Sequence, residues 1–235
     1  SYMWQGFIPQ TENPHSKNPE RGFLQSANQR PVDSTYPYFI PGSYLTARGI
    51  TISNKLAAMN NITPADMMKL QNDYYNTLAE DMRPILLKYI EENKLSATEK
   101  KYLAYFKNWD ILATPDSKGQ TVYQCWLDSL QVEIFKDELT EVKPEANWPT
   151  KQTLMETLTR DSAMRFIDNI NTPKIETLND AVTAAFKKAS VVFAKSEAEG
   201  KLDWTEFKNP TVYHLLKDAV MPFARTGLTV GGNGD

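Results

Sequence analysis

Most of the chain carries apolar residues at steps of three or four positions, the spacing that places side chains on one face of an α-helix. This period runs from residue 43 to about residue 226 and predicts a mainly helical region. Three such faces stand out, and they consist of Met67, Leu70, Tyr74, Leu78, Met82, Ile85 and Tyr89; of Val122, Trp126, Leu130 and Ile134; and of Leu178, Val182, Ala185, Ala189 and Val192. We expect them to form a hydrophobic core, because such residues are those most often buried.

The two ends of the chain lack this period. Residues 1–42 are rich in Pro, Gly, Asn and Ser, which predicts loops around one short strand near Phe23–Ala27. Residues 227–235 are rich in glycine and predict a truncated tail. The sequence therefore predicts three segments, 1–42, 43–226 and 227–235.

Short polar motifs predict where several helices begin. A Ser or Thr before the helix accepts a hydrogen bond from a free backbone N–H, and an acid three residues later returns the contact. The four start motifs are Thr63-Pro64-Ala65-Asp66, Ser96-Ala97-Thr98-Glu99, Trp148-Pro149-Thr150 and Thr177-Leu178-Asn179-Asp180. Pro84 lies within the first apolar face, and its missing backbone donor predicts a kink or a split there.

Composition excludes several classes of protein. The 235 residues carry a net charge of −3, and 23% of them are charged. The sequence therefore lacks the excess of basic residues that is typical of a nucleic-acid-binding surface. No apolar run approaches the roughly 20 residues of a transmembrane helix. Cys125 is the single cysteine, which rules out an internal disulfide.

Few residues suit metal or acid–base chemistry. His15 and His214 are the two histidines, too few for a multi-histidine zinc site. We interpret His15 as a solvated loop residue and His214 as a structural histidine in a helix-like segment. The pair Asp137-Glu138 is a weak acid–base candidate, because adjacent helical carboxylates point in different directions and nothing in the sequence indicates their burial.

A series of short motifs spans the chain in a fixed order. The first part contains Trp4-Gln5-Gly6-Phe7-Ile8-Pro9, Pro14, Asn18-Pro19-Glu20-Arg21-Gly22, Ala27-Asn28-Gln29-Arg30-Pro31, Tyr36-Pro37 and Thr46-Ala47-Arg48-Gly49-Ile50. The rest contains Thr63-Pro64, Asp73, Ala79, Pro84, Trp109-Asp110, Asp116-Ser117 and the closing Gly231-Gly232-Asn233-Gly234-Asp235. This order resembles the catalytic chain of the penicillin amidase (penicillin acylase) family of N-terminal nucleophile hydrolases.

The resemblance implies a helical segment excised from an αββα fold, and hydrolysis of N-acyl amides through an N-terminal serine whose own α-amine acts as the base. Asn28 matches the asparagine whose side-chain amide binds the oxyanion, and Arg48 matches the arginine that orients the active site. From the residues alone, Asn28 also fits a turn-forming asparagine, and Arg48 fits a structural or surface arginine.

Two departures from the family pattern narrow these expectations. Gln29 replaces the second asparagine of the family's pair, which leaves Asn28 as the expected donor. Some members take a calcium ligand from an acid after the Tyr-Pro pair, but Tyr38-Phe39-Ile40-Pro41 contains none. We therefore expect no cofactor or metal on this chain, and calcium in the full-length protein would need ligands from elsewhere.

Ser1 directly precedes the Trp4 motif, whereas the family nucleophile lies far upstream of that motif. We therefore expect a fragment of the catalytic β chain that lacks its nucleophile and is inactive alone. The implied partners are the α chain, the rest of the β chain and a small N-acyl amide substrate such as a β-lactam or an acyl homoserine lactone, without nucleic acid or membrane. Family members are usually exported, which implies a periplasmic or extracellular parent protein, although this chain carries no signal segment.

Two other interpretations remain open. The chain fits a non-catalytic helical binding or structural module, or an inactive relative that binds acyl ligands. An encoded Gly-Ser/Cys/Thr-Asn-x-Trp processing site upstream would favour the enzyme over both.

Overall fold

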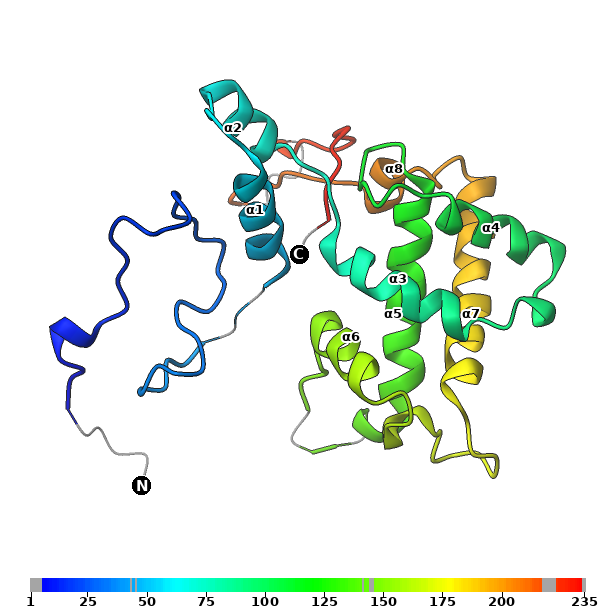
Figure 1. Ribbon diagram of the computed structural model, residues 1–235. Helices are drawn as coiled ribbons and strands as arrows, with labels where there is room; N and C mark the ends of the chain where they lie inside the picture. The colour runs from blue at the N-terminus through cyan, green and yellow to red at the C-terminus, as the bar shows by residue number, and fades with distance from the viewer. Residues whose placement is uncertain are drawn as a thin grey trace. The chain divides into compact units, whose positions relative to one another are not determined.

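The computed structural model describes residues 6–42, 44, 46–140, 142–143, 146–216 and 223–233. Within these ranges the chain forms eight α-helices, three short 3-10 helices and isolated β-bridges. Figure 1 shows how the helices follow one another along the chain. This confirms the mainly α fold. Internal contacts divide the chain between Asn72 and Asp73 into two units. The segment boundaries predicted at residues 42 and 226 do not coincide with this division and remain predictions.

The first unit contains η1 (Gln10–Glu12), α1 (Ala47–Ala58) and α2 (Pro64–Gln71). The strand predicted at Phe23–Ala27 is wrong, because these residues have no partner strand in the described part of the unit. Side chains occupy their backbone groups instead: Arg21 Nε donates to the Phe23 carbonyl, and the Gln29 amide bonds to the Ala27 N–H and the Gln25 carbonyl. Left-handed residues at Gly22 (φ 76°) and Asn28 (φ 65°) bend the chain on both sides.

The four helix starts predicted from capping motifs are confirmed. Thr63, Ser96 and Thr177 each accept from the backbone N–H three residues later, and the acid at that position accepts from the cap's own N–H. Thr150 caps its helix with its hydroxyl alone. These motifs begin α2, α4 (Ala97–Lys107), α7 (Leu178–Ala198) and α6 (Lys151–Arg160).

The split predicted at Pro84 as one of two outcomes does not occur, and the chain breaks earlier; a kink at Pro84 remains a prediction. Helix α3 (Thr77–Tyr89) contains Pro84 on its exposed side, where water can satisfy the carbonyl that loses its partner. The interruption lies between Gln71 and Thr77. There the Asn76 side chain caps α3 at 2.9 Å from Ala79 N, and the Asn76 backbone N–H donates to the Ile111 carbonyl at 3.0 Å.

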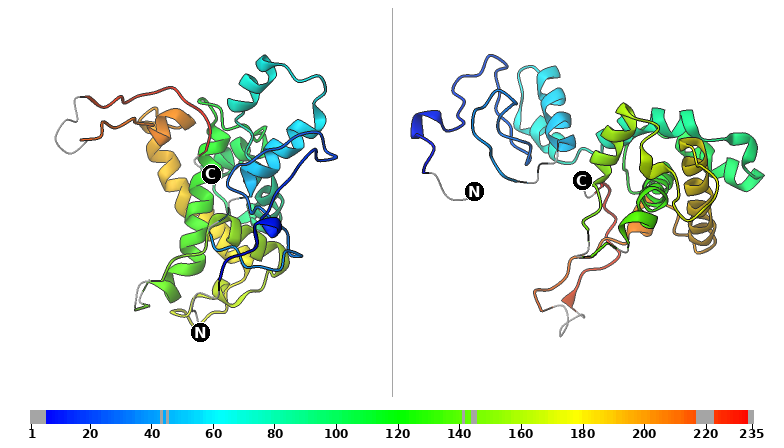
Figure 2. Two further views of the ribbon diagram at one scale, coloured as in Figure 1. Left: turned by 90° about the vertical axis from the view of Figure 1, so that its left-hand side faces the viewer. Right: turned by 90° about the horizontal axis from the view of Figure 1, so that it is seen from below.

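The second unit is built around α5 (Lys118–Leu139) and α7, which lie side by side in Figures 1 and 2. Trp126 of α5 is fully buried, with its ring 4.6 Å from that of Phe186 and 5.3 Å from that of Phe106. The apolar face of α5 is buried throughout, as predicted. On α7 the face is buried except for Val192, which is exposed.

Helix α8 (Trp204–Lys208) is followed by residues 209–216, which are not helical although the sequence predicts helix there. Asn209 adopts a left-handed φ of 43°, and Pro210 follows it, so the helix stops. The helix-like segment expected around His214 is therefore wrong: Val212 pairs with Arg225 in an isolated bridge, and Leu215 is 98% exposed. His15 is an exposed loop residue, as expected.

Residues near the C-terminus pack against the beginning of the same unit. The Gly232 N–H donates to the Ala113 carbonyl at 2.7 Å, and the Ala113 N–H donates to the Tyr74 carbonyl at 2.8 Å. Glycine is required at residue 231, because a Cβ there would lie 2.5 Å from the Ala113 carbonyl oxygen. The carbonyl of Gly232 also accepts from Trp204 Nε1 at 2.7 Å.

Replacement of Asn76 tests whether its buried side chain fixes the start of α3. Asn76 Nδ2 donates to Gln120 Oε1 at 2.9 Å, and both residues are buried. We expect Asn76→Ala to lower the free energy of unfolding by about 2–4 kcal/mol, because it removes a helix cap and leaves the Gln120 oxygen without a donor. Urea unfolding followed by circular dichroism measures this, with the exposed Asn93→Ala as control. A loss no larger than that of the control would contradict this role.

Candidate functional site

Asn28 and Arg48 come together although they are 20 positions apart in the sequence. Asn28 follows the irregular Gly22–Ala27 segment, and Arg48 lies in the first turn of α1. Arg48 Nη2 donates to Asn28 Oδ1 at 2.5 Å, and both residues are exposed. The two candidates that the family resemblance singled out therefore form one polar pair.

The contact with Arg48 determines which way the Asn28 amide faces. A guanidinium group has only N–H donors, so it can bond to the amide oxygen but not to the amide nitrogen. Asn28 Nδ2 is consequently turned away from Arg48, and no described residue accepts a hydrogen bond from it. The pair presents an uncharged NH₂ donor at an exposed position.

The charge of Arg48 adds to the effect of this donor. Among the described residues no carboxylate forms an ion pair with Arg48. A cation near the Asn28 amide favours negative charge at the same place, and this attraction grows when water is excluded. A fixed neutral donor beside a cation is the arrangement that stabilises an oxyanion.

The backbone of Asn28 limits which residues can occupy the position. Its φ of 65° lies in the left-handed region, which asparagine and aspartate tolerate far better than most side chains. The turn-forming property and the candidate donor role therefore belong to the same residue. The sequence left these as alternatives, but the geometry accommodates both.

Other parts of the motif series have structural contacts. Tyr36 donates its hydroxyl to the Glu12 carbonyl at 2.9 Å, and Tyr38 donates to the Glu12 carboxylate at 2.5 Å, which raises the pKa of Tyr38. Ser1 and Trp4 lie outside the described residues. Across the described ranges, no three His, Cys, Asp or Glu side chains gather in a way that could hold a metal ion.

The sequence profile of the penicillin amidase family matches residues 1–235. The chain belongs to the penicillin amidase family. Membership of this family indicates an amidase-like hydrolase. Within the part of the chain that the structure describes, none of the helices combines the length and the apolar character needed to cross a membrane.

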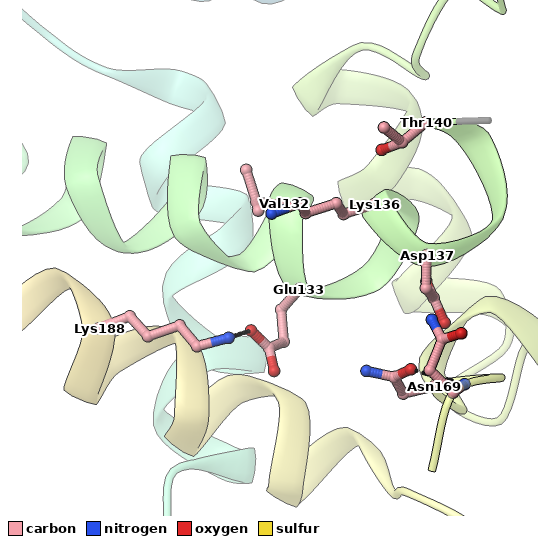
Figure 3. Close-up of a pocket in the computed structure, with 8 residues that line it drawn as sticks. Val132, Glu133, Lys136, Asp137, Thr140, Asn169 and Lys188 are labelled. Atoms are coloured by element: carbon pink, nitrogen blue, oxygen red, sulfur yellow. Dashed lines mark hydrogen bonds and ion pairs between the residues drawn. The ribbon is translucent and has the colours of Figure 1, made fainter.

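This penicillin amidase family member also has a polar cavity of about 620 Å³ in its second unit, shown in Figure 3. Lys188 of α7 forms an ion pair with Glu133 of α5 at its wall. Asp137 Oδ2 accepts from the Ile170 N–H at 2.8 Å. The cavity is lined by Val132, Glu133, Lys136, Asp137, Thr140, Asn169, Asn171 and Lys188.

Asp137 and Glu138 are half-buried, which the sequence did not indicate. Asp137 Oδ1 and Glu138 Oε2 are both shielded from solvent, and neither receives a hydrogen bond from a donor group in the described residues. Burial, followed by the adjacent Asp137 carboxylate, raises the pKa of Glu138 to about 7. No motif around these two residues predicts their burial, because the burial comes from the packing of distant segments around the end of α5.

The raised pKa of Glu138 predicts a pH-dependent effect of Glu138→Gln on stability. The folded protein holds the Glu138 proton more tightly than the unfolded chain, whose value is 4.5, so ionisation destabilises the fold as pH rises from about 4.5 to about 7. We expect Glu138→Gln to gain stability relative to the parent chain across this window and to level off above it. Urea unfolding at several pH values measures the difference. The exposed Glu206→Gln serves as control, and a flat difference for Glu138→Gln would refute the prediction.

Proposed function

We propose that this chain supplies the oxyanion-binding edge of a hydrolase that acts on N-acyl amides. The bond cleaved is a carbon–nitrogen bond other than a peptide bond. The observation that carries the proposal is the Asn28 amide, which Arg48 holds by its oxygen so that its NH₂ group is free to donate. Membership of the penicillin amidase family supports the same reaction class.

In the proposed reaction, a serine hydroxyl adds to the amide carbonyl and its proton passes to the α-amine of the same serine. The carbonyl electron pair moves onto oxygen, where Asn28 Nδ2 donates to it. Collapse of this intermediate breaks the C–N bond, and the amine leaves with the proton. Water then attacks the acyl ester in the same manner and releases the acid. One oxyanion donor of this kind is worth roughly 3–4 kcal/mol in the transition state.

The serine nucleophile comes, in this proposal, from a segment outside these 235 residues, and Ser1 does not serve as the nucleophile. The partners are the remainder of the hydrolase and a small N-acyl amide, without nucleic acid or membrane. The chemistry needs no cofactor on this chain, because a neutral amide and a fixed cation stabilise the oxyanion. We place the parent protein in the periplasm or outside the cell, as the family resemblance suggests.

Asn28→Asp tests the donor role with a minimal change in shape. The variant keeps an oxygen for Arg48 and tolerates the left-handed backbone, but it replaces the NH₂ donor with a negatively charged oxygen. We expect kcat of the processed hydrolase on a chromogenic N-acyl amide to fall by at least about 10²–10³-fold, with stability unchanged within about 0.5 kcal/mol.

The matched control for this test is Asn18→Asp. Asn18 is also an exposed asparagine with a left-handed φ, 49°, but its side chain forms no hydrogen bond with any residue that the structure describes. The control should retain the parental kcat. If Asn28→Asp also retained it, the chain would be better described as a non-catalytic binding or structural module.

The purified 235-residue chain should not hydrolyse phenylacetyl or other acyl amides. The physical reason is that, in this proposal, the nucleophilic serine lies outside these 235 residues, so that nothing attacks the carbonyl bound at the oxyanion edge. Product release measured over hours by a chromogenic assay checks this, with the processed hydrolase as positive control. Hydrolysis that disappears in Ser1→Ala would overturn the proposed location of the nucleophile.

A further inference from the structure

Gln29 closes a ring of contacts around the backbone of Asn28. Its Oε1 accepts from the Ala27 N–H at 2.6 Å, and its Nε2 donates to the Gln25 carbonyl at 3.2 Å. The two bonds tie the residue after Asn28 to residues before it, so they enclose the left-handed residue between them. Gln29 is half-buried whereas Asn28 is exposed. Asn28 can therefore reach a ligand, and Gln29 can support Asn28 from behind.

The same side chain packs against the helix that carries Arg48. Gly49 is buried in the first turn of α1, and a Cβ added there would lie 3.2 Å from both Cβ and Oε1 of Gln29. Gly49 has ordinary helical geometry, so its lack of a side chain is explained by this close approach and not by its φ. Gln29 therefore touches both elements that carry the site: it bonds to the segment before Asn28, and it packs against Gly49, the neighbour of Arg48 in α1.

We propose that Gln29 is a positioning residue that sets the orientation of the Asn28 amide toward the oxyanion through its bonds to Ala27 and Gln25 and its contact with Gly49. This inference rests on the proposed amide-hydrolase function and deepens it. The residue that departs from the family's paired asparagines thus has a role of its own. It does not touch the substrate; it acts through Asn28.

The test is a double-mutant cycle in the processed hydrolase with a chromogenic N-acyl amide. Gln29→Met keeps the length of the side chain and removes both hydrogen bonds. We expect kcat to fall about 10–100-fold with KM within about twofold, because a misplaced donor weakens transition-state stabilisation more than substrate binding. Gln29→Glu keeps the acceptor for the Ala27 N–H and should recover part of kcat.

The double variant distinguishes positioning from general destabilisation. If Gln29 acts only through Asn28, then Asn28→Asp/Gln29→Met loses no more kcat than Asn28→Asp alone. Losses that multiply, or an unchanged kcat in Gln29→Met, would overturn the inference while the proposed function stands. A parental kcat in Asn28→Asp would overturn both. The control Gln10→Met makes the same chemical change at an exposed residue of η1 and should keep the parental kcat.

A second measurement on the 235-residue chain needs no catalysis. The side-chain ¹⁵N amide signal of Asn28 can be assigned by its disappearance in Asn28→Asp. In Gln29→Met we expect it to shift toward the signal of exposed Asn18, while the signals of the second unit stay in place. An unmoved Asn28 signal would count against the positioning role even if the variant hydrolase failed to assemble.

Discussion

Trp126 places its ring between Phe106 of α4 and Phe186 of α7, and its indole N–H donates to the Val182 carbonyl at 3.0 Å. This fully buried side chain joins three helices and satisfies its own polar atom, so it contributes both apolar burial and a defined geometry. Three further elements of the second unit, α6, α8 and η3 (Arg165–Ile167), contact α5, and α3 contacts α7. The unit therefore depends on the alignment of α5 with α7.

The first unit is held together in a different way. Ala27 and Leu56 are the buried apolar side chains in its described part, while Phe7 and Phe39 are more than three-quarters exposed. Polar side chains make up for the missing core by bonding to the backbone, as Gln29 does. The candidate site thus lies on loops whose geometry comes from individual hydrogen bonds, which is common where a protein binds or reacts.

The sequence predicted features that depend on neighbouring residues and missed those that depend on distant ones. The predictions of helix caps at Ser96 and Thr177 were correct, because the contacts of each cap lie within one turn of helix. The break before Asn76 was missed, because its cause is the carbonyl of Ile111. For the site, the order of motifs identified Asn28 and Arg48, but the role of Gln29 depends on a backbone path that no motif describes.

The contacts of Ala113 with Tyr74 and Gly232 have a consequence for the architecture. They bring together residues at the two ends of the second unit, because Tyr74 lies just after its beginning and Gly232 near its end. The first and last described segments of the second unit are therefore held together through one backbone position, Ala113, so the helices between them start and finish at the same place in the unit.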